Sequence, residues 1–159
     1  MPVIELSTRI AAPRERVFDL SRSIDLHVAS TAQTGERPVG GVTSGLIGPD
    51  EEVTWQARHF GVIQLLTSRI TRFDRPRHFR DSMVRGAFKR FDHDHIFEEA
   101  GGATLMIDRF DFTTPLGVLG RIADTVFLRR YLQKFLDTRN QAIRRAAESE
   151  AWRKYLEPS

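Results

Sequence analysis

The segment "FKRFDHDHIF", residues 88–97, places two histidines and two aspartates at alternating positions. Histidine and aspartate at close quarters can bind a metal ion, work as an acid–base pair, or satisfy one another as ordinary buried polar groups. Successive side chains of a β-strand point to opposite faces of the sheet, so these four residues cannot converge on one ion. This removes the simplest metal site, one built from these four residues, and the expectation is that the protein holds no metal and no cofactor.

The apolar residues of this segment identify its buried face. Phe91 and Phe97 alternate in step with His93 and His95, so all four fall on the same side of the strand. We expect this side to be buried. The two aspartates fall on the opposite side and are predicted to point to solvent.

The same alternation can be followed in the neighbouring strand-like segments. It places His59, Asp81 and Asp108 on faces that also carry large apolar residues. A cavity behind the sheet would then be mainly apolar with a few polar groups, which is typical of ligand-binding pockets. The candidate ligand-binding residues are Trp55, His59, Asp81, Met83, His93, His95, Phe97, Asp108 and Phe110.

Four interpretations of the inward polar residues remain open. They can pair with one another, since buried polar groups need partners. They can orient the polar atoms of a ligand, or bind a metal. As acid and base, His93 or His95 held by Asp81 would abstract a proton beside a carbonyl and return one to a leaving hydroxyl, as an aromatising cyclase or dehydratase requires. These three are the candidate catalytic residues.

Other chemistry lacks the residues that it needs. The chain has no cysteine, which excludes disulfides, thiolate catalysis and cysteine-bound zinc or iron–sulfur centres. It contains no Gly-x-Ser-x-Gly, P-loop, His-Glu-x-x-His or Gly-x-Gly-x-x-Gly motif. Proton transfer is the reaction type that remains for an enzyme.

The elements that must position these residues follow from periodicity and turn signals. A strand is expected at 3–10, then a helix from Pro13 to about Ser21 and a second short helix capped by Ser23. A long amphipathic helix is expected from 117 to about 149. Six further strands are predicted at about 33–39, 51–60, 62–73, 77–87, 89–99 and 103–113.

This order predicts an α+β fold with a curved seven-stranded antiparallel sheet around the long C-terminal helix, and two short helices after the first strand. Sequential hairpins favour antiparallel pairing, and the helix must bury its apolar stripe. At 159 residues, without repeats or linkers, the chain is expected to form a single domain over 1–159. In loop 40–51, Leu46 and Ile47 suggest either a hydrophobic plug or a lid over the cavity.

Charge and hydropathy limit the classes of partner that the protein is expected to bind. The net charge is only +3, although 21 of the 24 basic residues are arginine, and acidic residues lie among them. This mixture lacks the one-sided basic patch of nucleic-acid-binding proteins, so we expect no nucleic acid partner. No segment approaches the length of a membrane span, and we expect a soluble cytoplasmic protein without stable membrane insertion. A homodimer is left open.

The sequence resembles the START-like superfamily, also called the SRPBCC or Bet v 1-like superfamily, which includes proteins of the polyketide cyclase/dehydrase type. The resemblance rests on "I…I.AP.ERVFDL" at 4–20, "VTWQARHFG" at 53–61, "DSMVRGAFKRFDHDHIF" at 81–97 and "TPLGVLG" at 114–120. It implies the helix-grip fold and a cavity between sheet and helix for a small hydrophobic or lipid-like molecule. It supplies no established catalytic residue.

Overall fold

The fold is built on one seven-stranded antiparallel sheet. The computed structural model describes residues 3–59, 61–114 and 120–157. The strand order is β1-β7-β6-β5-β4-β3-β2, so every neighbour pair except β1 and β7 is also consecutive in the chain. The strands are β1 (Val3–Ile10), β2 (Arg37–Gly41), β3 (Glu52–His59), β4 (Val62–Asp74), β5 (His78–Arg85), β6 (Arg90–Ala100) and β7 (Ala103–Thr113).

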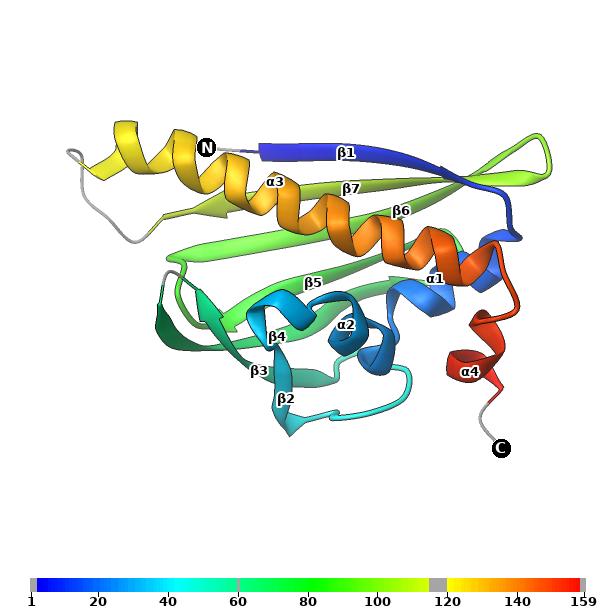
Figure 1. Ribbon diagram of the computed structural model, residues 1–159, viewed down its shortest axis with the longest axis horizontal. Coiled ribbons are helices and arrows are strands. Elements are labelled where there is room, and N and C mark those ends of the chain that lie inside the picture. Colours follow the sequence, from blue (N-terminus) through cyan, green and yellow to red (C-terminus); the bar gives the residue numbers. More distant parts are fainter. Residues whose placement is uncertain (1–2, 60, 115–119, 158–159) are drawn as a thin grey trace.

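The helices gather on one side of this sheet. The long helix α3 crosses in front of it, and the short helices α1 and α2 lie beside the C-terminal half of α3 (Figure 1). The predicted cap holds, because the side chain of Ser23 accepts a hydrogen bond from the backbone N–H of Leu26 at 3.1 Å. The helices are α1 (Arg14–Ser21), α2 (Ile24–Ser30), α3 (Gly120–Ala147) and α4 (Trp152–Leu156), with a 3-10 turn, η1 (Ala32–Thr34).

This arrangement is the predicted helix-grip fold. The ends of six of the seven strands agree with the expected ranges to within two residues, apart from position 60, which lies outside the described residues. The strand expected at 33–39 is the exception, because residues 32–34 form η1 and β2 begins only at Arg37. Gly35 ends η1 with a left-handed backbone, φ 62°, which glycine adopts without strain.

Two further differences concern the helices. The first three residues of the expected long helix, 117–119, lie outside the described residues. The C-terminal helix α4 was not predicted, and its Trp152 ring lies under the guanidinium of Arg16 at 4.2 Å. A five-residue helix held by tertiary contacts leaves too short a period to be recognised in a sequence.

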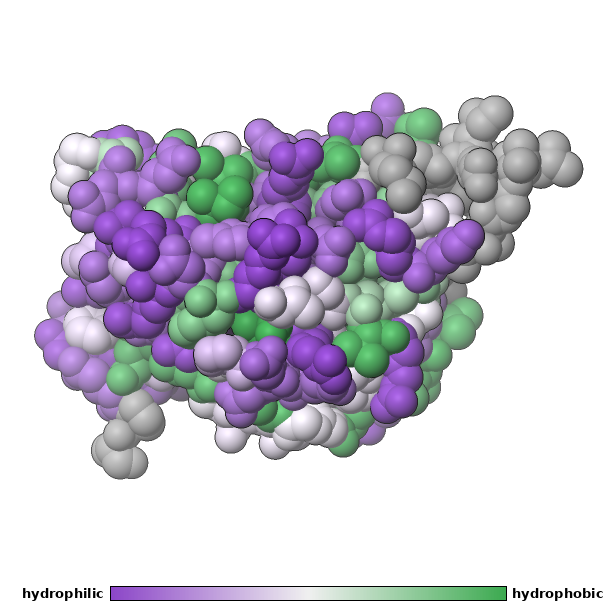
Figure 2. Space-filling view, turned by 180° about the vertical axis from the view of Figure 1, so that it is seen from behind, coloured by the Kyte–Doolittle hydropathy of each residue, from purple (hydrophilic) through white to green (hydrophobic). Residues whose placement is uncertain are grey.

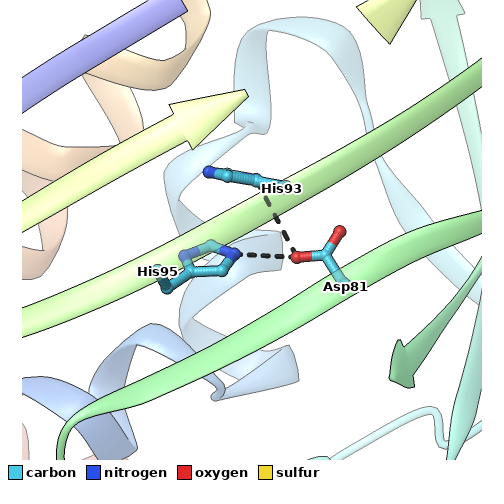
Figure 3. A group of neighbouring side chains, drawn as sticks. All are labelled: Asp81, His93 and His95. Atoms are coloured by element: carbon cyan, nitrogen blue, oxygen red, sulfur yellow. Dashed lines mark hydrogen bonds and ion pairs between the residues drawn. The ribbon is translucent and has the colours of Figure 1, made fainter. Parts of the chain in front are cut away.

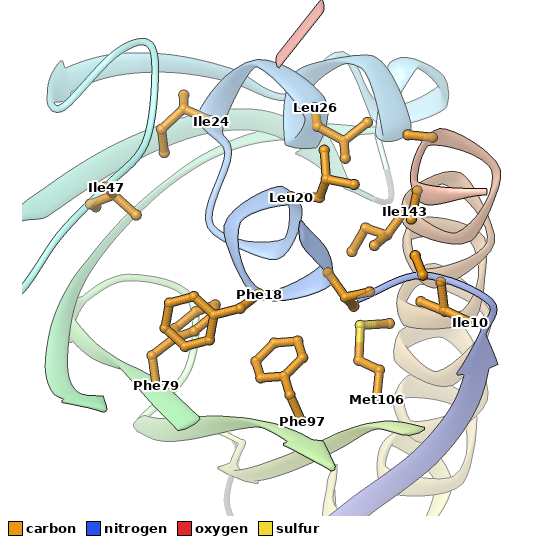
Figure 4. Packing of buried hydrophobic residues seen from close by; sticks show 14 of the residues in the cluster. Ile10, Phe18, Leu20, Ile24, Leu26, Ile47, Phe79, Phe97, Met106 and Ile143 are labelled. Carbon is orange, nitrogen blue, oxygen red and sulfur yellow. The ribbon is translucent and has the colours of Figure 1, made fainter. Parts of the chain in front are cut away.

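Phe18 lies at the centre of the main hydrophobic cluster (Figure 4). Its ring meets those of Phe73, Phe79 and Phe97 edge-on, with centroids 5.2–5.4 Å apart. The cluster therefore joins α1 to the inner face of the sheet at one end, where β5 and β6 pass beneath α1. At the other end a second cluster contains Phe91, Phe110 and Phe112 of the sheet and Leu136 of α3.

Loop 40–51 contributes to the same core. Ile47 is buried at 5% exposure and belongs to the cluster around Phe18. The backbone of Leu46 forms a β-bridge with Ser23, and the N–H of Ile47 donates to the carbonyl of Arg22 at 3.2 Å. The loop thus takes the form of the hydrophobic plug.

The opposite side of the molecule is mainly hydrophilic. Figure 2, seen from behind the view of Figure 1, shows hydrophilic residues predominating, with smaller hydrophobic areas between them. Asp94 lies on the outer face of the sheet, where it accepts hydrogen bonds from His78 and Arg80. Asp92 accepts from Ser82 and Arg90 in the same way. The outward direction of both aspartates is confirmed, but each is paired rather than simply solvated.

Within the described ranges, no helix combines the length and the apolar character that crossing a membrane requires.

Candidate functional site

A cavity of about 180 Å³ lies between the inner face of the sheet and α3. Its wall is mainly apolar and includes Trp55 of β3, Phe79 of β5, Phe110 of β7 and Leu136 of α3. Polar side chains interrupt this wall in two places. The floor cluster comprises the lining residues Asp81, His93, His95 and Arg139 with Asp108 and Asn140 behind them, and the mouth cluster comprises the lining residues His27, Glu36 and His59 with Tyr131 beside His59.

The floor cluster follows from strand register. Asp81 of β5 pairs directly with His93 of β6, and Asp108 of β7 pairs directly with His95. Paired residues on neighbouring strands point to the same face of the sheet. The two histidines of one strand therefore lie between a carboxylate on each side.

Each histidine donates to a different carboxylate. His93 Nε2 donates to Asp108 Oδ1 at 2.8 Å, and His95 Nε2 donates to Asp81 Oδ2 at 2.7 Å. The remaining ring nitrogens face the other acid, with His93 Nδ1 at 3.8 Å from Asp81 Oδ2 and His95 Nδ1 at 3.4 Å from Asp108 Oδ1. Figure 3 shows the two rings converging on Asp81. The two imidazoles lie close together, with centroids 3.8 Å apart and ring planes tilted by 34°.

Asp108, like Asn140 in the same cluster, is fully buried. Its exposed fraction is 0%, and α3 supplies its further partners. Asn140 Nδ2 donates to Asp108 Oδ2 at 2.6 Å, and the guanidinium of Arg139 lies 3.6 Å from Oδ1. Arg139 also donates to the backbone carbonyl of Ser21 at 2.9 Å. The carboxylate thus ties the sheet to α3 and, through Arg139, to α1.

The same contacts set the charge of the cluster. Burial raises the pKa of Asp108, but its contacts with the two histidines outweigh this and hold the pKa well below the ordinary value. The pKa of Asp81 is also lowered, because the hydrogen bond from His95 and the nearby charge of His93 outweigh burial. Burial lowers the pKa of His95, but two carboxylates reverse the shift and raise it. The pKa of His93 is lowered by burial and by His95. Of the two histidines, His95 holds its proton more strongly.

The mouth cluster gathers around the carboxylate of Glu36. His27 of α2 donates to Glu36 Oε2, and His59 Nε2 of β3 lies 3.6 Å from Oε1. His59 Nδ1 is hydrogen-bonded to the hydroxyl of Tyr131 on α3 at 2.6 Å. The ring of His27 stacks on Trp55 with centroids 4.2 Å apart. This cluster joins α2, β3 and α3 around one side of the cavity.

Burial raises the pKa of Glu36, but the hydrogen bond from His27 and the nearby His59 imidazole outweigh it and lower the pKa to about 2. Burial, together with the charge of Glu36, raises the pKa of Tyr131. The Glu36 carboxylate therefore stays ionised at neutral pH, and the two histidines lie beside it.

The residues predicted from alternation fall into two groups. Trp55, His59, Asp81, His93, His95 and Phe110 line the cavity together. The other three predicted residues lie near the cavity but do not line it. Phe97 is packed in the cluster around Phe18, Met83 packs against the second hydrophobic cluster, and Asp108 lies behind the histidines.

Several residues of the site were not predicted from the sequence. Glu36 and His27 come from a turn and a short helix, where no alternation indicates which way a side chain points. Arg139 and Asn140 lie on the buried side of α3, at positions where the apolar periodicity is interrupted by polar residues. The only indication in the sequence was that these polar residues interrupt the apolar periodicity of the long helix.

Comparison with known proteins adds a family and a set of similar folds. A family model described as "Polyketide cyclase / dehydrase and lipid transport" matches residues 1–148. No curated protein matches the chain significantly.

Among solved structures, the chain is similar to TTHA0849 from Thermus thermophilus, with 16% sequence identity and a TM-score of 0.75 over 92% of this chain and 97% of that one. It is similar to a START superfamily protein from Mycobacterium smegmatis, with 11% identity and a TM-score of 0.68 over 92% and 97% of the two chains. Ginseng major latex-like protein 151 from Panax ginseng has 15% identity and a TM-score of 0.67 over 93% and 98%. At these identities the likeness establishes the fold alone.

Proposed function

Because this chain belongs to the polyketide cyclase/dehydrase and lipid-transport family, we propose that it binds a small hydrophobic molecule in the cavity between the sheet and α3. The observation that carries the proposal is an apolar wall interrupted by two polar clusters. Apolar walls supply affinity, and a few placed polar groups fix the orientation of a ligand. A ligand with an oxygen-bearing end would place that end against Asp81 or His95 and its apolar body against Trp55.

The size of the cavity limits the ligand. An apolar cavity of about 150 Å³ accommodates benzene, and this cavity measures about 180 Å³. The fit is to a one-ring compound with a short substituent rather than to a long acyl chain. Within the lipid-like and small hydrophobic molecules that the sequence suggests, we therefore favour the small ones.

Calorimetric titration with 4-ethylphenol and with ethylbenzene tests this proposal. We expect 1:1 binding of both, with the phenol about 3- to 10-fold tighter, since one net hydrogen bond contributes roughly 0.5–1.5 kcal/mol. Asp81→Leu should remove the preference for the phenol and retain the binding of ethylbenzene. Failure of the wild-type protein to bind either compound would refute the proposal.

A second candidate function is catalysis of the cyclase or dehydratase type. It is favoured by the two histidine–carboxylate pairs of the floor cluster, His93 with Asp108 and His95 with Asp81, because a positioned imidazole is the commonest general acid or base. Turnover of an activated polyketide-like substrate should then be lost in His93→Ala and His95→Ala, with substrate binding retained. Unchanged turnover in both variants would reject these residues as acid and base.

The remaining expectations belong to the same proposal. We propose one domain over residues 1–159, a cytoplasmic location and no nucleic acid partner, with a homodimer left open. They are supported by the single sheet with one helical layer and by the mixture of charges along the chain.

A further inference from the structure

The nitrogen atoms of the two floor histidines converge on one carboxylate. His95 Nε2 and His93 Nδ1 lie 2.7 and 3.8 Å from the same atom, Asp81 Oδ2 (Figure 3). One ligand atom from each of these three residues falls within 4.8 Å of the others. We propose that Asp81, His93 and His95 form a binding site for a divalent transition-metal ion such as Zn²⁺, a site that the proposed binding of a hydrophobic molecule does not require.

The third ligand comes from a neighbouring strand. Alternation along β6 argues against a metal held by residues 92–95 alone, and the structure indeed turns both aspartates of that segment outward. Register places Asp81 of β5 beside His93 instead. Two histidines and one carboxylate are a set that both zinc and non-haem iron sites use.

The spacing of the three atoms fits a metal with small adjustments. Zinc bonds of about 2.0–2.1 Å in a tetrahedron put neighbouring ligand atoms about 3.4 Å apart. The two measured separations, 2.7 and 3.8 Å, lie on either side of that value. A small rotation of the Asp81 carboxylate away from His95 and toward His93 would bring both separations close to it.

The far side of each ring already has the partner that a metal ligand needs. Histidines that bind metals almost always present their other nitrogen to a carboxylate or carbonyl, which fixes the orientation of the ring. Here Asp108 occupies that position for both rings, at 2.8 Å from His93 Nε2 and 3.4 Å from His95 Nδ1. Asn140 and Arg139 hold Asp108 in turn. Asp108 is therefore a positioning residue.

One atom of the cluster lacks a hydrogen bond in this arrangement. His95 Nδ1 is fully buried and has no hydrogen-bond partner among the residues that the structure describes. Its contact with Asp108 Oδ1 at 3.4 Å misses hydrogen-bonding geometry. Buried polar atoms without partners are rare and call for an explanation. A metal that draws Nε2 off Asp81 would allow the ring to turn and Nδ1 to donate to Asp108.

The proposed site faces the cavity. Asp81 retains 21% of its side-chain exposure, whereas His93, His95 and Asp108 retain 8%, 2% and 0%. Three protein ligands leave at least one coordination position open. That position would lie on the cavity side, where it could take water or an oxygen atom of a bound molecule.

The test uses the metal alone. Chelator-treated full-length protein is titrated with Zn²⁺ by calorimetry, and with Co²⁺ while its visible absorption is followed. We expect 1:1 binding, loss of that binding in Asp81→Asn and His93→Gln, and a 10- to 100-fold weaker affinity in Asp108→Asn, the usual effect of removing an outer partner. The Co²⁺ absorption should indicate nitrogen and oxygen ligands only. Circular dichroism establishes that each variant is folded.

The mouth cluster supplies the matched control. It also contains two histidines and a carboxylate, but His27 and His59 contact different oxygens of Glu36, and Tyr131 holds the second nitrogen of His59. Glu36→Gln should bind Zn²⁺ like the wild-type protein. The proposal is overturned if the wild type binds no Zn²⁺ at 1:1, or if Asp81→Asn and His93→Gln bind it as tightly as the wild type. Neither result bears on the binding of 4-ethylphenol, which is measured without metal.

Discussion

Asp108 is the residue that connects the histidines of the site to α3. It is a fully buried carboxylate that accepts from His93 on the neighbouring strand and from Asn140 on α3. A buried charge is tolerated only when it is paired and hydrogen-bonded. Removing one partner destabilises the fold, because the remaining group stays buried without compensation. Asp108 thus holds the histidines in place and also joins the sheet to the helix.

Asp108→Ala should lower the free energy of unfolding by about 3–5 kcal/mol, because it leaves Arg139, Asn140 and His93 without their shared acceptor. Urea denaturation followed by circular dichroism measures the change. Asp111→Ala is the control on the same strand, since Asp111 pairs with Arg90 on the outer face with 35% of its side chain exposed. That surface pair should contribute about 1 kcal/mol or less. Equal effects of the two substitutions would contradict the central position of Asp108.

Glu36 makes a prediction about acid stability. Its pKa is about 2 in the folded chain against an ordinary 4.5. A lowered pKa stabilises the fold fully above the unfolded value, and the stabilisation disappears as the pH falls from 4.5 toward 2. The shift corresponds to a contribution on the order of 3 kcal/mol at neutral pH.

Urea denaturation of the wild type and of Glu36→Gln from pH 6 to pH 2 measures this contribution to the free energy of unfolding. The wild type should lose more stability than the variant between pH 4.5 and 2, so the two curves approach each other in acid. Parallel curves over this range would show that the two histidines do not stabilise the ionised carboxylate.

At the scale of elements, the pairing of β2 with β3 depends on Gly41. Its φ is +70°, and a Cβ at this position would lie 2.1 Å from the carbonyl oxygen of Glu52. Gly45 has a similar φ of +73° but open space around the same position. Substitution of Gly45 therefore introduces backbone strain alone, whereas substitution of Gly41 introduces both backbone strain and a steric clash.

Gly45→Ala should lower the free energy of unfolding by about 1–2 kcal/mol, the cost of a left-handed backbone for a residue with a Cβ. Gly41→Ala should cost clearly more, since the alanine must also push β2 away from β3. Thermal and urea denaturation of the two variants give the comparison. A Gly41→Ala variant as stable as Gly45→Ala would mean that β2 moves without penalty.

The elements themselves were largely predictable from the sequence. Strand alternation identified the inner face of β6, because Phe91 and Phe97 mark the same side as His93 and His95. It could not identify which residues of β5 and β7 lie opposite, since the register of β6 with its two neighbours depends on the geometry of the connecting turns. The pairing of Asp81 with His93 therefore required the structure.

The residues that alternation missed share a physical reason. Glu36 lies between η1 and β2, and its direction is set by contacts with His27 and His59, which are distant in the sequence, rather than by a local period. Arg139 lies four residues from both Phe135 and Ile143, on the apolar stripe of α3, but the sequence does not show which group its buried guanidinium contacts until the carboxylate beneath it is known. Polar networks depend on long-range contacts, and apolar periodicity carries no information about them.

At the scale of the whole molecule, the sheet and α3 enclose a cavity with polar groups at its floor and at its mouth. The main hydrophobic cluster around Phe18 fills one end of the space between sheet and helices (Figure 4). The cavity occupies the part that the apolar side chains leave open. The proposed binding of a small hydrophobic molecule requires this space to accept it.

Fluorescence quenching measures whether a small ligand enters the cavity. The chain has two tryptophans, and only Trp55 lines the cavity, so Trp152→Phe leaves a single reporter at the site. Titration of this variant with 4-nitrobenzyl alcohol, a one-ring quencher of tryptophan emission, should give saturable 1:1 quenching that excess 4-ethylphenol reverses. Quenching that rises linearly with concentration and is unaffected by 4-ethylphenol would show that no ligand enters the cavity, and would refute the proposed binding.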